Sequence, residues 1–160
     1  MQIKNYIEKV EDSDAYNEWI KDNPDYYIVH VFIMSDKPTQ VGYYSKEQDN
    51  IVTFNIEEDV VSRNEPEESF KDGGVIEKLE LSKVMVDLEG ARDKSESLRK
   101  EKYPEEIVDN EMIILQTIDS EPTYNITLIT KAFNFINIKM KAEDKTIKEE
   151  KKSSILDLKK

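Results

Sequence analysis

The chain has 160 residues, with 23 basic and 35 acidic side chains and a formal net charge of −12. This length suits one domain with a buried core, whereas the charge disfavours binding to nucleic acid or to an anionic membrane surface. The absence of cysteine excludes disulfides and thiolate zinc sites, and the single histidine excludes most histidine-based metal clusters.

The N-terminal residues predict two short helices. Apolar residues recur at helical spacing over 3–10 and again over 15–20. Asp12 or Ser13 is placed to cap the second helix, and Pro24 limits it, because the residue before a proline is pushed out of the α region.

Three strands and an acidic segment are predicted next. The run Tyr26–Met34 is apolar apart from one histidine and rich in β-branched and aromatic residues, which is typical of a central strand covered on both faces. Gln40–Tyr44 and Ile51–Ile56 follow as shorter strands. Residues 57–76 combine acidic clusters with proline and glycine, and they indicate a mobile loop between two halves of the chain.

The second half repeats this organisation. Residues 79–86 suggest a strand, after which Asp87 is placed to cap a helix over 88–103 that ends at Pro104. A change of parity calls for a bulge or a turn near Phe135. The remaining strands are expected at 112–118, 124–130, 133–140 and 146–149.

These elements predict an α+β fold in which helices pack on one face of an antiparallel sheet. Each half has a helix ended by proline and then several strands, so the chain is consistent with two α-β-β-β units. The predicted divisions are an N-terminal half at 1–60, an acidic linker at 61–78 and a C-terminal half at 79–160. One compact domain overall is the alternative.

The C-terminal half resembles the PepSY domain, a small module with a cystatin-like fold. The residues that carry this resemblance are the helix over 88–104 and the hairpin over 138–147. Lys141 replaces the aspartate of the family's hairpin, and Lys145 replaces the glycine that supplies a positive φ in its turn. The whole chain is also similar to archaeal proteins that carry one such domain. The resemblance implies a non-catalytic binding or protease-modulating module.

Motifs for catalysis or cofactor binding are missing from the sequence. His30 lies in an apolar run without a nucleophile motif, which favours a core or edge histidine over a catalytic one. The segment from Asp12 lacks the glycine and the glutamate of a calcium loop, and no phosphate-binding glycine loop occurs. We therefore expect no enzyme, no cofactor and no metal. A deep pocket that gathers His30 with two carboxylates would favour an enzyme instead.

The candidate binding residues are four tyrosines, Tyr26, Tyr27, Tyr43 and Tyr44, on neighbouring predicted strands. Because side chains alternate along a strand, one tyrosine of each pair must point away from the core. A tyrosine-rich surface of this kind is typical of protein interfaces. The alternative is that all four pack under the N-terminal helices with Trp19.

Together these observations predict a module that binds or inhibits a protein or peptide, through the tyrosines or an exposed strand edge. The alternative is an acidic antagonist, such as an immunity protein, of a basic protein such as a nuclease, because residues 1–60 carry 5 basic and 13 acidic side chains. A homo-oligomer is compatible with either function. The N-terminus has no apolar stretch of signal-peptide length, so we expect a cytoplasmic protein.

Overall fold

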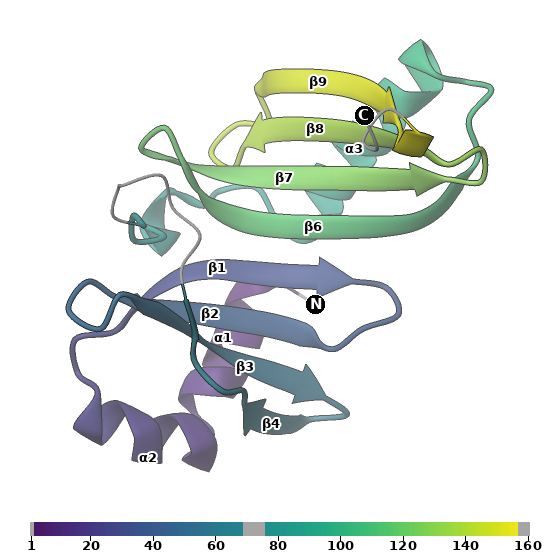
Figure 1. The fold of residues 1–160 in the computed structure, drawn as a ribbon. Helices are drawn as coiled ribbons and strands as arrows, with labels where there is room; N and C mark the ends of the chain where they lie inside the picture. Colours follow the sequence, from purple (N-terminus) through teal and green to yellow (C-terminus); the bar gives the residue numbers. More distant parts are fainter. Residues whose placement is uncertain (1, 69–75, 157–160) are drawn as a thin grey trace.

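The computed structural model describes residues 2–68 and 76–156, and it shows an α+β fold built on one antiparallel sheet (Figure 1). The strands occur in the order β4-β3-β2-β1-β6-β7-β8-β9, and β5 also pairs with β3. The elements are α1 (Ile3–Glu11), α2 (Asp14–Asp22), β1 (Tyr27–Met34), β2 (Thr39–Ser45), β3 (Asn50–Glu57), β4 (Val60–Arg63), β5 (Glu67–Glu68), the 3-10 helix η1 (Leu81–Lys83), α3 (Leu88–Lys102), β6 (Val108–Ile118), β7 (Glu121–Thr130), β8 (Asn134–Lys141) and β9 (Ile147–Ser154).

The two halves of the chain meet at the centre of this sheet. Strands β1 to β4 form one antiparallel meander and β6 to β9 form another. The meanders join where β1 pairs with β6, with Val31 opposite Leu115 and Met34 opposite Met112. The prediction of a central strand at Tyr26–Met34 is therefore confirmed, apart from its first residue.

The helices cover one face of the sheet, and in Figure 1 α1 and α3 lie behind the strands. Fully buried residues from both halves, among them Val31, Phe54, Ile113 and Ile138, form one hydrophobic cluster on this side. The expectation that β1 is covered on both faces is wrong. On its other face the side chains of β1 are partly exposed, because none of the helices in the described part of the chain packs there.

Residues 76–86, which we call the connector, cross the sheet between β1 and β6. The Tyr27 hydroxyl donates to the carbonyl of Ile76 on the face opposite the helices. Two residues later the Thr117 hydroxyl donates to the carbonyl of Lys78, and the amide of Leu79 donates to the carbonyl of Ile28. Leu79 is 1% exposed and belongs to the helix-side core. The two strands thus diverge beyond their last pair, and the connector passes between them.

The predicted helix boundaries agree with the structure because their capping groups are in place. Ser13 accepts a hydrogen bond from the amide of Tyr16, and Asp87 accepts one of 2.7 Å from the amide of Gly90. In the turn between β8 and β9, Lys145 has a φ of 67°, so a lysine adopts the backbone conformation for which the resembling family uses glycine.

Three predicted elements need correction. Residues 79–86 form η1 and extended chain rather than a strand, because their backbone groups bond to strand ends and turns and not to a ladder. The segment 57–76 is not all loop, since it contains β4 and β5; its residues 69–75 lie outside the described part. The last strand extends to Ser154 because it pairs along all of β8.

None of the helices in residues 2–68 and 76–156 has the length and apolar character needed to span a bilayer. The cytoplasmic location stays a prediction.

Candidate functional site

The face of the sheet opposite the helices, which we call the open face, is the candidate site. A bulge at Val29 lets both Ile28 and Val31 face the core, where they pair with Tyr43 and Val41. From His30 onward the alternate residues of β1 therefore point to the open face. The bulge thus decides which side chains of the central strand are available to a partner.

Four apolar side chains, Phe32, Met34, Met112 and Ile114, form what we call the central patch. Phe32 lies opposite Ile114 and Met34 lies opposite Met112, so the four are direct cross-strand neighbours. All four are partly exposed although they lie in the middle of a nine-stranded sheet. The central patch is built jointly by the two halves of the chain.

Side-chain amides flank the central patch on both sides. On the β2 side, Gln40 donates to Asn55 over 2.9 Å, and Asn55 in turn donates to Asn64. On the β7 side, Asn137 donates to Asn125 over 2.8 Å and to Thr127. These groups satisfy one another, so the open face can lose water at its centre with few unpaired polar atoms.

A group of lysines occupies the open face beyond β7. We call Lys139, Lys141, Lys148 and Lys151 the lysine group. Each has a glutamate oxygen within 4.0 Å. Among the described residues two glutamates serve all four lysines, Glu121 for Lys141 and Lys148 and Glu149 for Lys139 and Lys151. This part of the face is therefore net positive in a chain whose net charge is −12.

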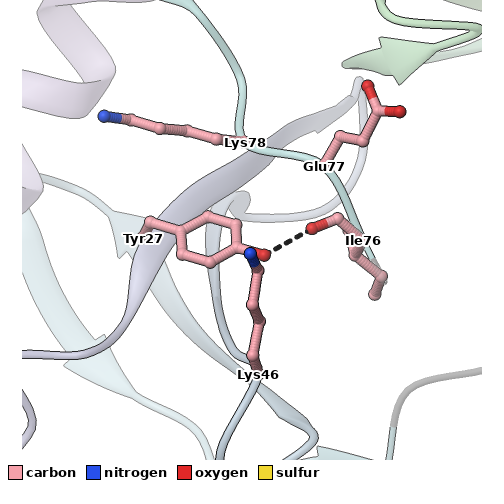
Figure 2. Close-up of a pocket in the computed structure, with 5 residues that line it drawn as sticks. All are labelled: Tyr27, Lys46, Ile76, Glu77 and Lys78. Carbon is pink, nitrogen blue, oxygen red and sulfur yellow. Dashed lines mark hydrogen bonds between the residues drawn. The ribbon is translucent and has the colours of Figure 1, made fainter. Parts of the chain in front are cut away.

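A shallow pocket of about 630 Å³ lies at the other end of the face, where the connector begins to cross the sheet (Figure 2). It is lined by Tyr27, Lys46, Ile76, Glu77 and Lys78. The hydroxyl of Tyr27 closes one wall through its 2.6 Å bond to Ile76. No ion pair within residues 2–68 and 76–156 involves the two lysines, so their ammonium groups can meet an anionic group of a ligand.

The four predicted tyrosines divide between the two faces. Tyr26 and Tyr43 lie on the helix side and pack against Trp19, with ring centroids at 4.8 and 5.9 Å. Burial raises the pKa of Tyr43, and the nearby Glu11 raises it further. On the open face, Tyr27 and Tyr44 contact each other edge to face at 5.9 Å.

The tyrosines on the open face differ in how far they are exposed to a ligand. One tyrosine of each pair does point away from the helices, but the ring of Tyr44 is 0% exposed. Tyr27 is partly exposed and lines the pocket, so it is the tyrosine best placed to meet a ligand. The binding role of the four residues stays a prediction.

His30 also lies on the open face, with its ring against Gly42. A Cβ added to Gly42 would stand 2.2 Å from Cε1 of His30, so the glycine provides the space for the ring. Burial lowers the pKa of His30 to about 4, which keeps the imidazole neutral at pH 7. No group of three or more potential metal ligands occurs among the residues that the structure describes.

Within residues 2–68 and 76–156, the sheet has one long edge strand, β9. On the N-terminal side, β4 and β5 both cover β3 but are short and separated by Pro66. On the C-terminal side, β9 is eight residues long, and its residues 148–152 are all charged. Charged side chains on an edge oppose the addition of another strand. The geometry therefore favours the open face over an edge as a binding surface.

An acidic stripe lies on the helix side, away from the open face. Asp14, Glu18 and Asp22 follow one another at intervals of four residues along α2, and all three are exposed. None of them belongs to an ion pair within the part of the chain that the structure covers. The acidic stripe and the lysine group thus lie on different sides of the molecule.

The sequence did not single out the central patch or the lysine group. A signal for the patch was present, since both parities of residues 28–34 are largely apolar while only one can face the helices. For the lysine group the signal was the alternation of Lys139 and Lys141 with buried residues of β8. The sequence does not show which strands lie next to these residues, because the strand pairing is known only from the structure.

The fold has a counterpart among solved structures. The crystal structure of a candidate lipoprotein from Clostridium difficile 630 superposes with a TM-score of 0.57 and 20% sequence identity, over 88% of this chain and 91% of that chain. At this identity the likeness shows a shared fold and nothing about a site. Neither a comparison with family models nor one with curated proteins finds a match to the chain.

Proposed function

We propose that the protein is a non-enzymatic module that binds a protein or peptide partner on its open face. The observation that carries this proposal is the central patch, in which two strands present Phe32, Met34, Met112 and Ile114 without a covering helix. A second sheet or an extended segment placed on such a face removes apolar surface from water, which is the main driving force for association. The satisfied amides around the patch form a polar rim.

The same architecture supports the idea of two PepSY-like units that share one sheet. Each half supplies helical structure and a four-stranded meander, and the order of the strands is mirrored about the β1–β6 pair. A partner bound across the central patch would then contact both units at once. This arrangement suits a binding or inhibitory module better than an enzyme, because the ring of the sole histidine is packed against Gly42.

The test is capture of partners from the cell of origin with tagged wild-type protein and with a variant carrying Phe32→Ser and Ile114→Ser. The matched control is Met85→Ser, since Met85 is 71% exposed and lies on the connector rather than on the open face. We expect a partner that wild type and control retain and the patch variant loses. Equal retention by all three proteins, each shown to be folded by circular dichroism, contradicts the proposal.

An acidic antagonist of a basic protein is the second candidate, and the acidic stripe on α2 favours it. Neutralising the stripe with Asp14→Asn, Glu18→Gln and Asp22→Asn should weaken capture of a basic partner, and raising the salt concentration should do the same. If capture depends on this stripe and not on the central patch, the antagonist function replaces the first proposal.

A further inference from the structure

The open face carries two kinds of recognition group in a fixed geometric relation. Phe32, Ile114, Asn125 and Lys139 are successive register partners across β1, β6, β7 and β8. Met34, Met112, Thr127 and Asn137 form a parallel row, and Lys151 continues it on β9. Both rows therefore run from apolar through amide or hydroxyl to cationic side chains, and in the first row Glu149 follows Lys139 on β9.

The distance between the central patch and the lysine group determines how far apart the matching side chains of a ligand must be. Ile114 and Lys139 are separated by one intervening strand, which corresponds to about 10 Å at the usual distance between strands. An extended chain covers this distance in about three residues. Side chains about two or four residues apart share one face of an extended chain. A segment that lies across the strands can therefore place an apolar side chain on the central patch and, about two to four residues on, a carboxylate at the lysine group.

The charge of the lysine group determines which ligand groups it attracts. Two glutamates are shared among four lysines, and the distances grow from 3.2 Å for Lys139 to 3.8 Å for Lys151. Additional carboxylates would be attracted to this part of the face, whereas a basic segment would be repelled. The excess of acid elsewhere in the chain disfavours an acidic ligand over much of the remaining surface.

A protein segment fits these features better than a nucleic acid does. The phosphates of a nucleic acid would meet an overall charge of −12, and its backbone brings no aliphatic group to the central patch. Leucine, methionine or phenylalanine next to glutamate or aspartate supplies both contacts.

We propose that the open face binds an extended protein segment in which apolar residues are followed, about two to four residues on, by acidic residues. This inference rests on the proposed function, since the central patch is common to both. The lysine group adds the specificity for acid, and it does so from β8 and β9, outside the patch.

The test is fluorescence anisotropy with labelled peptides and the full chain. One peptide carries two leucines followed after about three residues by two glutamates, and its matched partner has glutamines in their place. The lysine variant carries Lys139→Gln, Lys141→Gln and Lys151→Gln; Lys148 is kept because it donates to the Ile118 carbonyl. The control variant carries Lys4→Gln, Lys94→Gln and Lys100→Gln, which are exposed lysines on the helices.

We expect the glutamate peptide to bind wild type and the control variant alike, and to bind the lysine variant on the order of tenfold more weakly. The glutamine peptide should show the same loss on wild type. Added salt should reduce the advantage of the glutamate peptide.

The outcomes separate this inference from the proposed function. If both peptides bind wild type equally and the Phe32→Ser, Ile114→Ser variant loses both, the preference for acid is refuted and the binding function stands. If that variant keeps both peptides, the proposed function fails too. Absence of peptide binding to wild type, or tighter lysine-dependent binding of a labelled single-stranded oligonucleotide, overturns the inference.

Discussion

The single histidine should make the stability of the fold fall as the pH drops from 6.5 toward 4. His30 has a pKa of about 4 in the folded protein, against 6.5 when unperturbed, because burial disfavours its charged form. Between these two values the unfolded chain binds a proton that the folded chain does not, so acid favours unfolding. Above pH 6.5 both states are neutral and the penalty vanishes.

The size of this penalty follows from the two pKa values. At pH 5 it amounts to about 2 kcal/mol of the free energy of unfolding, and below pH 4 it approaches roughly 3 kcal/mol. The variant His30→Phe keeps a planar ring over Gly42 and cannot titrate. Carboxylates that are protonated over the same range affect both proteins equally, so the difference between them isolates the histidine.

Two measurements check this prediction. Urea unfolding of wild type and His30→Phe at pH 7 and pH 5 should show wild type losing about 2 kcal/mol more than the variant. Because the chain has one histidine, proton NMR of its imidazole gives the pKa of His30 without assignment. An NMR pKa near 6.5, with no difference between the two urea series, would refute the role given to burial.

Three further substitutions test the packing. Leu79→Ala should lower the free energy of unfolding by about 2–5 kcal/mol in urea denaturation, because it leaves a cavity where the connector crosses the sheet; a loss below about 1 kcal/mol would argue against a packed crossing. Lys145→Gly should raise the melting temperature, with a gain of about 1 kcal/mol, since φ at this turn is 67°; unchanged or lower stability would contradict strain at the turn. Gly42→Ala should cost about 1–3 kcal/mol through its clash with the His30 ring, and the cost should largely disappear in a His30→Ala background. An equal cost in both backgrounds would exclude this clash.

The sequence was sufficient for most of the secondary structure. Helical periodicity and capping residues such as Ser13 and Asp87 located the helices, because these signals are local to a few turns of chain. Alternation located β8, and the apolar run located β1. Each of these predictions depends on neighbours in sequence.

Features that depend on distant residues were not predictable in the same way. Residues 79–86 have the apolar spacing of a strand, but Leu79 is buried because it enters the gap between β1 and β6. The apolar run of β1 could not show whether its second face was covered, since that depends on where the helices pack. One tyrosine of each pair was expected to point away from the core, but the contact of Tyr27 with Ile76 depends on the connector and could not be predicted from the strands.

The crossing of the connector has a consequence for how the two halves align. One dipeptide holds both strands, since Lys78 accepts from Thr117 of β6 and Leu79 donates to Ile28 of β1. A slip of β6 by one residue against β1 would turn Ile114 inward and Leu115 outward, exchanging core for surface along the whole strand. Such a slip would also be incompatible with keeping these two hydrogen bonds at once. The connector contributes no strand, yet it fixes the register between the two meanders. The apolar side chains of both meanders therefore stay on matching faces of the sheet.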